Sequence, residues 1–158
     1  GGWRARGNIA RSTVGFIPHH AGKPTPMAKL TDRQIEFLKE PYIAEFVTLM
    51  KDGSPQITPV WVDTDGEHII VNSEEGRVKV RNVRRDPRVA VGIYDPENTY
   101  SRVLNVRGRV VEITAEGAAQ NIDDLSEKYN GVRPYRAHNP DKPRVILKIA
   151  PDSIDSRI

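Results

Sequence analysis

Two Asp-Gly pairs, Asp52-Gly53 and Asp65-Gly66, most constrain the fold of this chain, because each lies between two apolar, strand-like runs. An Asp-Gly pair between such runs is typical of a tight β-hairpin, since glycine adopts the positive φ that the turn requires. The runs AEFVTLMK, PQITPVWVD and EHIIVN therefore predict an antiparallel meander over residues 44–72.

Three further runs predict strands downstream of this meander. They cover residues 89–94 (VAVGIY), 103–113 (VLNVRGRVVEI) and 145–149 (VILKI). Gly108, inside the second of these runs, predicts a bulge or bend of the kind that barrel closure often needs. Six strands with two or three short helices between them favour a mainly β fold, a small antiparallel β-barrel.

Two segments show the periodicity and end signals of helices. Thr31 begins the capping-box pattern T-x-x-Q, and Pro41 ends the short helix that follows. Apolar residues then recur at helical spacing from a cap at Thr114 to Asn130-Gly131, where glycine supplies a left-handed stop.

The segment 76–88, GRVKVRNVRRDPR, carries six basic residues and one acid directly after the strand-like run HIIVNS. We expect Ser73 to cap a helix here and Pro87 to end it, with Val80 and Val83 packed inward. Spacing alone leaves two interpretations open, a solvated charged face and an anion-binding site. The basic side chains are Arg77, Lys79, Arg81, Arg84, Arg85 and Arg88.

Composition narrows the class of protein. The chain has 158 residues, enough for one domain, and no apolar run approaches the ~18 residues of a membrane span, so we expect a soluble protein without a membrane partner. The lack of cysteine excludes disulfides and thiolate metal sites and favours a cytoplasmic location. Residues 1–26, rich in Gly, Pro and Arg, are expected to be an N-terminal extension or arm, and residues 27–158 a single domain.

Several function classes lack their signatures. The sequence contains no G-x-S-x-G, P-loop or G-x-G-x-x-G motif, and its four histidines show no metal-ligand spacing, so we expect no metal. Nucleic-acid binding by a small basic barrel is weakly supported, because the net charge is only +3 and aromatic residues are 6% of the chain. We therefore expect no nucleic-acid partner.

Five sequence blocks occur in a characteristic order: DGSPQITPVW, NSEEGRVKVRNVRRDPRVAV, DPENTYSRVLNVRGRVVEI, KYNG and RVILKIAP. Through these blocks, and most specifically through K-x-R-N-x-x-R-D-P-R at 79–88, residues 31–151 resemble the pyridoxamine 5'-phosphate oxidase-like, FMN-binding split-barrel superfamily. Within it, the chain resembles the flavin/deazaflavin oxidoreductase group, whose members use coenzyme F420. The resemblance implies a six-stranded antiparallel split β-barrel that forms a homodimer, with two identical cofactor sites between the subunits.

The resemblance also implies which residues bind the cofactor. Asn72 and Ser73 would lie beside the polyol or phosphate, Arg77 and Lys79 would hold the phosphate, and Asn82 would fix the helical turn that presents them. The residues that would border the isoalloxazine-like ring and its polyol are Ser54, Gln56, Thr58, Pro59 and Val60. The residues that would come from the second subunit are Tyr100, Ser101 and Arg102.

The function that the resemblance implies is that of an F420-dependent oxidoreductase acting on an unidentified small organic substrate. The hydride chemistry belongs to the cofactor, so no catalytic side chain is assigned. FMN is the alternative cofactor, with a flavin reductase or a non-catalytic flavin carrier as the alternative function. The ending APDSIDSRI lacks the Arg-Leu-x-Pro segment of true pyridoxamine phosphate oxidases, which argues against that activity. The spare cations that favour the deazaflavin, with its acidic tail, are Arg4, Arg6, Arg11, Arg81, Arg84 and Arg85.

Overall fold

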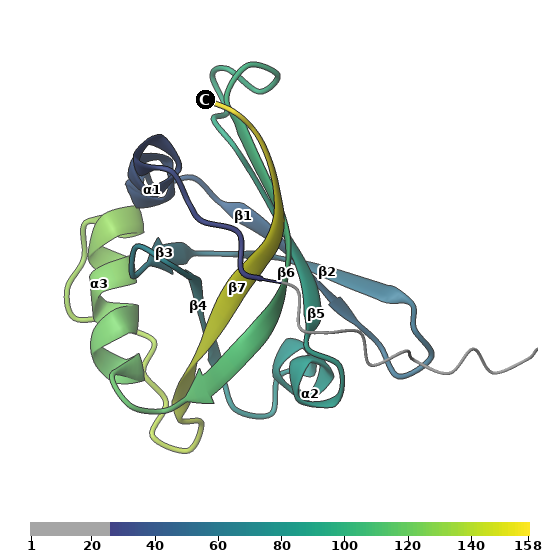
Figure 1. Cartoon of the computed structure of the whole chain (residues 1–158). Helices are drawn as coiled ribbons and strands as arrows, with labels where there is room; N and C mark the ends of the chain where they lie inside the picture. The colour runs from purple at the N-terminus through teal and green to yellow at the C-terminus, as the bar shows by residue number, and fades with distance from the viewer. Residues whose placement is uncertain (1–25) are drawn as a thin grey trace, which may run out of the picture.

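The computed structural model describes residues 26–158, so the extension predicted for residues 1–26 lies outside the described residues except for its last one. Three helices and seven strands follow one another along the described chain (Figure 1). Their order is α1 (Asp32–Lys39), β1 (Ala44–Leu49), β2 (Pro55–Val60), β3 (Val62–Thr64), β4 (Ile69–Glu74), α2 (Val78–Arg85), β5 (Arg88–Tyr94), β6 (Val103–Thr114), α3 (Ala118–Asn130) and β7 (Arg144–Arg157).

One antiparallel sheet contains all seven strands, in the order β2-β1-β5-β6-β7-β4-β3. The strands β2 and β3 lie at opposite edges of this sheet, although only Trp61 separates them in sequence. A flat sheet of this order would hold its edges roughly 29 Å apart, at about 4.8 Å for each of six steps. The sheet must therefore curl until its two edges meet at Trp61, which gives the split barrel of Figure 1.

The mainly β, antiparallel split-barrel prediction is confirmed, but the strand count of six is one too low. The predicted strand over residues 55–63 breaks at Trp61. Before the break the chain pairs with β1, where Val60 lies opposite Ala44; after it Val62 lies opposite Val71 of β4. One apolar run in the sequence thus serves two edges of the sheet.

Both predicted hairpins are present. Gly53 and Gly66 have φ values of 85° and 94°, and they lie in the turns of the antiparallel pairs β1–β2 and β3–β4. The bulge predicted at Gly108 is also present, as a register shift between Arg107 and Gly108 in the pairing of β6 with β7. A Cβ atom on Gly108 would overlap the carbonyl oxygen of Ala150, so only glycine fits at this bulge.

The helix α1 begins as predicted. Thr31 accepts a hydrogen bond from the Gln34 amide, and the Gln34 side chain accepts one from the Thr31 amide, which completes the capping box. The predicted cap of α3 at Thr114 is wrong, because Thr114 is the last residue of β6. The cap is Gly117, which has a φ of 73°, and the helix begins at the next residue. Among residues 26–158, no helix is long and apolar enough to cross a membrane.

The prediction that Ser73 caps α2 is also wrong. Ser73 is buried within β4 opposite Val145 of β7, and this pairing carries the strand through Glu74. The chain turns at Gly76 and the cap of α2 is Arg77. The inward packing of Val80 and Val83 is confirmed, since both are buried.

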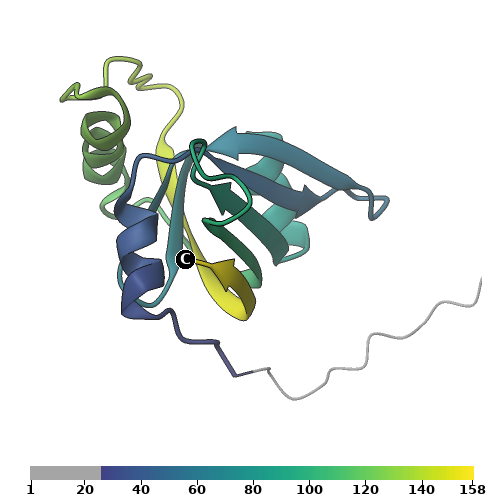
Figure 2. The same cartoon turned by 90° about the horizontal axis from the view of Figure 1, so that it is seen from above.

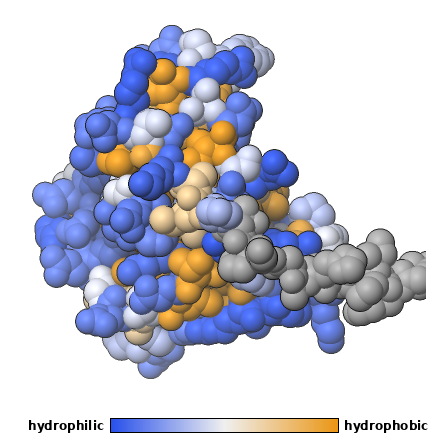
Figure 3. Space-filling view, in the orientation of Figure 1, coloured by the Kyte–Doolittle hydropathy of each residue, from blue (hydrophilic) through white to orange (hydrophobic). Residues whose placement is uncertain are grey.

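The core lies inside the curl of the sheet, where Phe46, Ile93, Leu104 and Leu147 are almost fully buried. Helices α1 and α3 lie on one side of the curled sheet and α2 on the other (Figure 2). Apolar side chains also reach the surface along the middle of the molecule, between hydrophilic margins (Figure 3). The described chain therefore leaves part of its apolar surface uncovered.

The close packing of Gly108 against β7 can be tested by substitution. We expect Gly108→Ala to lower the free energy of unfolding by about 1–3 kcal/mol, because the new methyl group meets backbone that cannot move away. The matched control is Gly92→Ala, whose Cβ would lie 3.3 Å from the movable Asn105 side chain and whose cost should be smaller. Urea unfolding of both variants measures this. Equal losses of unfolding free energy in the two variants would contradict the close approach of Gly108 to the Ala150 backbone.

Candidate functional site

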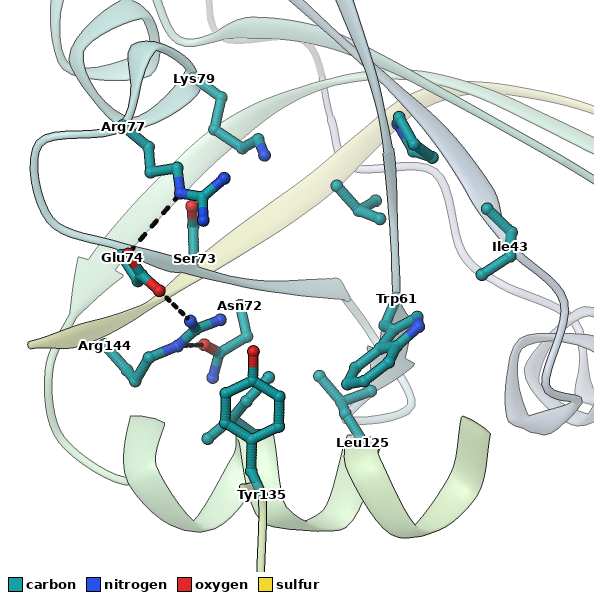
Figure 4. A pocket seen from close by; sticks show the side chains of 13 residues that line it. Ile43, Trp61, Asn72, Ser73, Glu74, Arg77, Lys79, Leu125, Tyr135 and Arg144 are labelled. Atoms are coloured by element: carbon teal, nitrogen blue, oxygen red, sulfur yellow. Dashed lines mark hydrogen bonds and ion pairs between the residues drawn. The ribbon is translucent and has the colours of Figure 1, made fainter. Parts of the chain in front are cut away.

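A cavity of about 340 Å³ opens beside Trp61, where the two edges of the sheet meet (Figure 4). Its lining divides into an apolar half and a charged half, as is common in sites for small molecules. The apolar half consists of Ile43, Pro59, Val60, Trp61, Ile122, Leu125 and Tyr135. The charged and polar half consists of Asn72, Ser73, Glu74, Arg77, Lys79 and Arg144.

Among the described residues, the charged half contains three cations, Arg77, Lys79 and Arg144, and one carboxylate, Glu74. Arg77 Nε lies 3.8 Å from Glu74 Oε2, and Arg144 Nη1 lies 3.2 Å from Glu74 Oε1. Burial lowers the pKa of Lys79 below its ordinary value, and the charges of Arg77 and Arg144 lower it further. The cluster carries an excess of two positive charges, so an anion in the cavity would be stabilised.

Hydrogen bonds fix the position of Arg144. Its Nε donates to Asn72 Oδ1 at 2.7 Å, and the Asn72 amide nitrogen donates to the Ala118 carbonyl at 2.9 Å and to Asn121 Oδ1 at 3.0 Å. The guanidinium lies 5.5 Å from the centre of the Tyr135 ring. Burial lowers the pKa of Arg144, although Tyr135 and Glu74 oppose this change. Asn72 of β4, which is itself bonded to α3, thus holds this side chain in place.

Stacked rings form the wall of the apolar half. Trp61 stacks on Tyr129 with 5.3 Å between ring centres, and Tyr135 meets Trp61 edge to face at 6.2 Å. The Tyr129 hydroxyl accepts a hydrogen bond from the Val62 amide at 3.1 Å and donates one to the Tyr42 carbonyl at 2.7 Å. These bonds hold the indole ring at the point where β2 ends and β3 begins.

A half-buried lysine, Lys128, supports the back of this wall. Lys128 Nζ donates to the carbonyls of Leu38 at 2.6 Å and Val62 at 2.7 Å, so it ties α3 to α1 and β3. Burial lowers its pKa to about 8, against the opposing effects of Asp63 and Glu40.

The segment that carries Tyr135 is held to α3 by one carboxylate. The Tyr135 amide donates to Asp123 Oδ1 at 2.8 Å, and His138 Nε2 lies 3.1 Å from the same oxygen. Both bonds lower the pKa of Asp123, so this carboxylate is a stable acceptor. The Tyr135 ring is thereby kept over the cavity.

The structure brings six of the thirteen sequence-predicted cofactor residues into the cavity. They are Pro59, Val60, Asn72, Ser73, Arg77 and Lys79.

Three predicted residues of the hairpin lie beyond the cavity. Ser54 is in the turn, where its hydroxyl donates to Asp52, and Gln56 accepts a hydrogen bond from Thr48. Thr58 lies one residue outside the lining, and its buried hydroxyl has no hydrogen-bond partner in the described structure.

Asn82 is a buried residue of α2 and does not line the cavity. Its amide nitrogen donates to Thr48 Oγ1 at 2.9 Å, and its carbonyl oxygen accepts a bond from Arg85 at 2.8 Å. Asn82 therefore anchors α2 to β1. This is the helix that follows Arg77 and carries Lys79.

The predicted residues of the β5–β6 loop lie away from this cavity in a single chain. Arg102 Nε bonds to Asp95 at 3.0 Å, and Tyr100 is 84% exposed. Their contribution from a second subunit, with that of Ser101, stays a prediction.

The arginines expected to serve an acidic tail have partners within the chain. Arg81 donates to the Gly76 carbonyl, Arg84 to Glu75, and Arg85 to the Leu49 carbonyl. Arg4, Arg6 and Arg11 lie outside the described residues.

Sequence reasoning missed much of the lining. Arg144 begins the block RVILKIAP, but no pattern placed its guanidinium beside Glu74. Trp61 lies within the strand-like run PQITPVWVD and Tyr135 within the Pro-rich stretch RPYRAHNPDKP, and neither pattern marks a binding residue. The only available signal was the apolar spacing that puts Ile122 and Leu125 on one helix face.

Comparisons with known proteins agree with this architecture. A family model described as pyridoxamine 5'-phosphate oxidase matches residues 30–157. The chain belongs to the pyridoxamine 5'-phosphate oxidase-like split-barrel family. An F420 reductase of known structure is 30% identical with a TM-score of 0.69, over 76% of this chain and 94% of that one.

Other solved members of the split-barrel fold are more distant. A conserved hypothetical protein from Mycobacterium tuberculosis is 25% identical with a TM-score of 0.65, over 83% of this chain and 86% of that one. The heme storage protein HutZ from Vibrio cholerae is 14% identical with a TM-score of 0.58, over 82% and 96%, and shares the fold alone. No curated protein sequence matches the chain.

The pKa of Lys128 predicts a pH effect on the stability of this split barrel. Below pH 8 both the folded and the unfolded chain carry the proton, and the cost of burying the charge is complete. Between pH 8 and the ordinary pKa of 10.5 the unfolded chain binds more protons, so this lysine makes stability rise with pH. After allowance for solvent screening, we expect Lys128→Met to reduce this rise by about 1–2 kcal/mol.

Urea unfolding at about pH 7.5 and pH 9.5 measures the effect. The exposed Lys51→Met is the control with the same change of charge. An unaltered pH dependence in Lys128→Met would contradict the proposed burial of its charge.

Proposed function

We propose that this protein is an F420-dependent oxidoreductase, which transfers a hydride between a deazaflavin cofactor and an unidentified small organic substrate. The observation that carries the proposal is that Arg77 and Lys79 face an aromatic, apolar wall across one cavity. Such a cavity suits a ligand with a phosphate at one end and a flat ring at the other. The 30% identity to an F420 reductase over most of the chain supports the choice of cofactor.

The charged end fits a phosphate. The Lys79 ammonium lies half-buried beside two guanidinium groups, which lowers its pKa, and a bound anion would relieve that repulsion. Charge-assisted hydrogen bonds from arginine or lysine contribute about 1.5–3 kcal/mol each. Arg77 and Lys79, which lie two positions apart at the start of α2, would hold the phosphate.

The apolar end fits a ring system. Ile43, Trp61 and Leu125 offer an apolar wall, and Pro59 has no amide that needs a hydrogen-bond partner. When bound, the deazaflavin supplies the hydride chemistry. The residues of the chain hold and orient the ring and exclude water, and none of them needs to act as a nucleophile.

The alternative is an FMN-binding flavoprotein, either a flavin reductase or a carrier without turnover. One observation favours it: the excess of two positive charges in the cavity matches the dianion of a phosphate monoester such as FMN. The arginines of α2 do not favour the deazaflavin, because they already bond within the chain.

We also propose that residues 27–158 are one cofactor-binding domain that forms a homodimer. A groove crosses β1, β2, β5, β6 and β7, with apolar residues such as Val47 and Val106 beside the charged Glu45, Arg107 and Asp155, and within it Ile57 is 61% exposed. Burying such a groove against a second copy would be favourable. A second copy would also supply the predicted contacts from Tyr100, Ser101 and Arg102.

The phosphate assignment has a direct test. We expect Arg77→Ala with Lys79→Ala to weaken binding of oxidised F420 by about 100-fold or more, because two charge-assisted contacts are lost. Quenching of the coenzyme fluorescence on binding measures the affinity. The matched control is Arg81→Ala with Arg84→Ala, which removes the same charge from the same helix and should change the affinity little.

The same titration with FMN distinguishes the alternative function. Tighter binding of FMN than of F420 by the unmodified protein would favour the flavoprotein. Unchanged affinity for both cofactors in the Arg77 and Lys79 double variant would overturn the site assignment.

A further inference from the structure

Arg144 is the cation of the cavity that the proposed phosphate contacts leave unused. Its side chain is only 12% exposed, and Asn72 and Glu74 engage its Nε and Nη1. Arginine has five N–H donors in a rigid fork, so donors remain after these two bonds and the interaction with the Tyr135 side chain. Because the fork is already held in place, little conformational freedom is lost when an anion binds to it.

Glu74 separates Arg144 from the phosphate end of the cavity. One carboxylate oxygen of Glu74 faces Arg144 and the other faces Arg77. A single small anion that bridged the two guanidinium groups would meet this carboxylate, and like charges repel. Two anionic groups, one on each side of Glu74, fit the cavity better than one group in the middle.

The Arg144 side of Glu74 borders the aromatic wall. The guanidinium lies 5.5 Å from the centre of the Tyr135 ring, and Tyr135 contacts Trp61. Figure 4 shows Arg144 and Tyr135 together on one side of Glu74, with Arg77 and Lys79 on the other. An acidic group on Arg144 would therefore place the body that carries it against apolar, planar side chains.

We propose that Arg144 and Tyr135 form a carboxylate subsite, and that the substrate is a small organic acid with a planar, apolar body. The planar guanidinium matches a carboxylate in two parallel hydrogen bonds, whereas the Tyr135 ring packs against the body of the acid. Calling this acid the substrate rests on the proposed oxidoreductase function. The subsite itself rests on the side chains around Arg144.

Calorimetric titration with 2-naphthoate and its uncharged analogue 2-naphthamide tests the subsite. We expect the protein to bind naphthoate at least about tenfold more tightly than naphthamide. In Arg144→Met this preference should fall to within about twofold, and Arg144→Lys should lie between, because it keeps the charge without the fork. The exposed Arg136→Met, in the segment of Tyr135, should keep the full preference.

The same titration on protein saturated with F420 tests whether the acid is a second reactant. We expect naphthoate to bind alongside the cofactor, and Arg144→Met to weaken F420 binding by less than about tenfold, well below the loss in the Arg77 and Lys79 double variant. Displacement of naphthoate by F420, or a loss of F420 affinity in Arg144→Met as large as in the Arg77 and Lys79 double variant, would overturn the proposal.

The outcomes separate the two proposals. If F420 and FMN both fail to bind, the oxidoreductase proposal fails, while the naphthoate preference of the cofactor-free protein still tests the subsite. Equal affinity of the original protein for naphthoate and naphthamide overturns the subsite without any variant, so a folding defect in Arg144→Met cannot conceal the result.

Discussion

The placement of β2 and β3 at opposite edges of one sheet is the constraint on which the remaining architecture depends. A single residue, Trp61, joins strands that six inter-strand steps separate, so the sheet has to curl. The curl encloses the core and leaves a cavity where the edges meet. Tyr129 and Lys128 bond to the backbone at Val62, and thereby fix the join from the side of α3.

The chemistry of the cavity follows from which elements meet at this join. Strand β4 brings Glu74, the start of α2 brings Arg77 and Lys79, and the first residue of β7 brings Arg144. Glu74 is the shared ionic partner of Arg77 and Arg144, and Asn72 supports Arg144 in addition. The wall of rings comes from the join itself and from α3 and the segment after it. A cavity with one charged and one apolar half is the result.

Local signals predicted the strands, both hairpins, the α1 capping box and the bulge at Gly108, because each depends on a few neighbouring residues. Signals failed where tertiary pairing overrides them. Ser73 has the chemistry of a helix cap, but pairing with β7 keeps it in a strand. Thr114 is likewise retained by β6. The resemblance named Arg77 and Lys79, whereas Arg144 entered the cavity through a pairing between β4 and β7 that no sequence pattern encodes.

The proposed function requires this cavity to hold the phosphate and ring of a deazaflavin. The most direct measurement is the absorbance spectrum of the ligand released from protein purified from a host that makes both F420 and FMN. We expect a band near roughly 420 nm, as is typical of the deazaflavin chromophore. A band near roughly 450 nm, as expected for FMN, or the absence of any released chromophore, would contradict it.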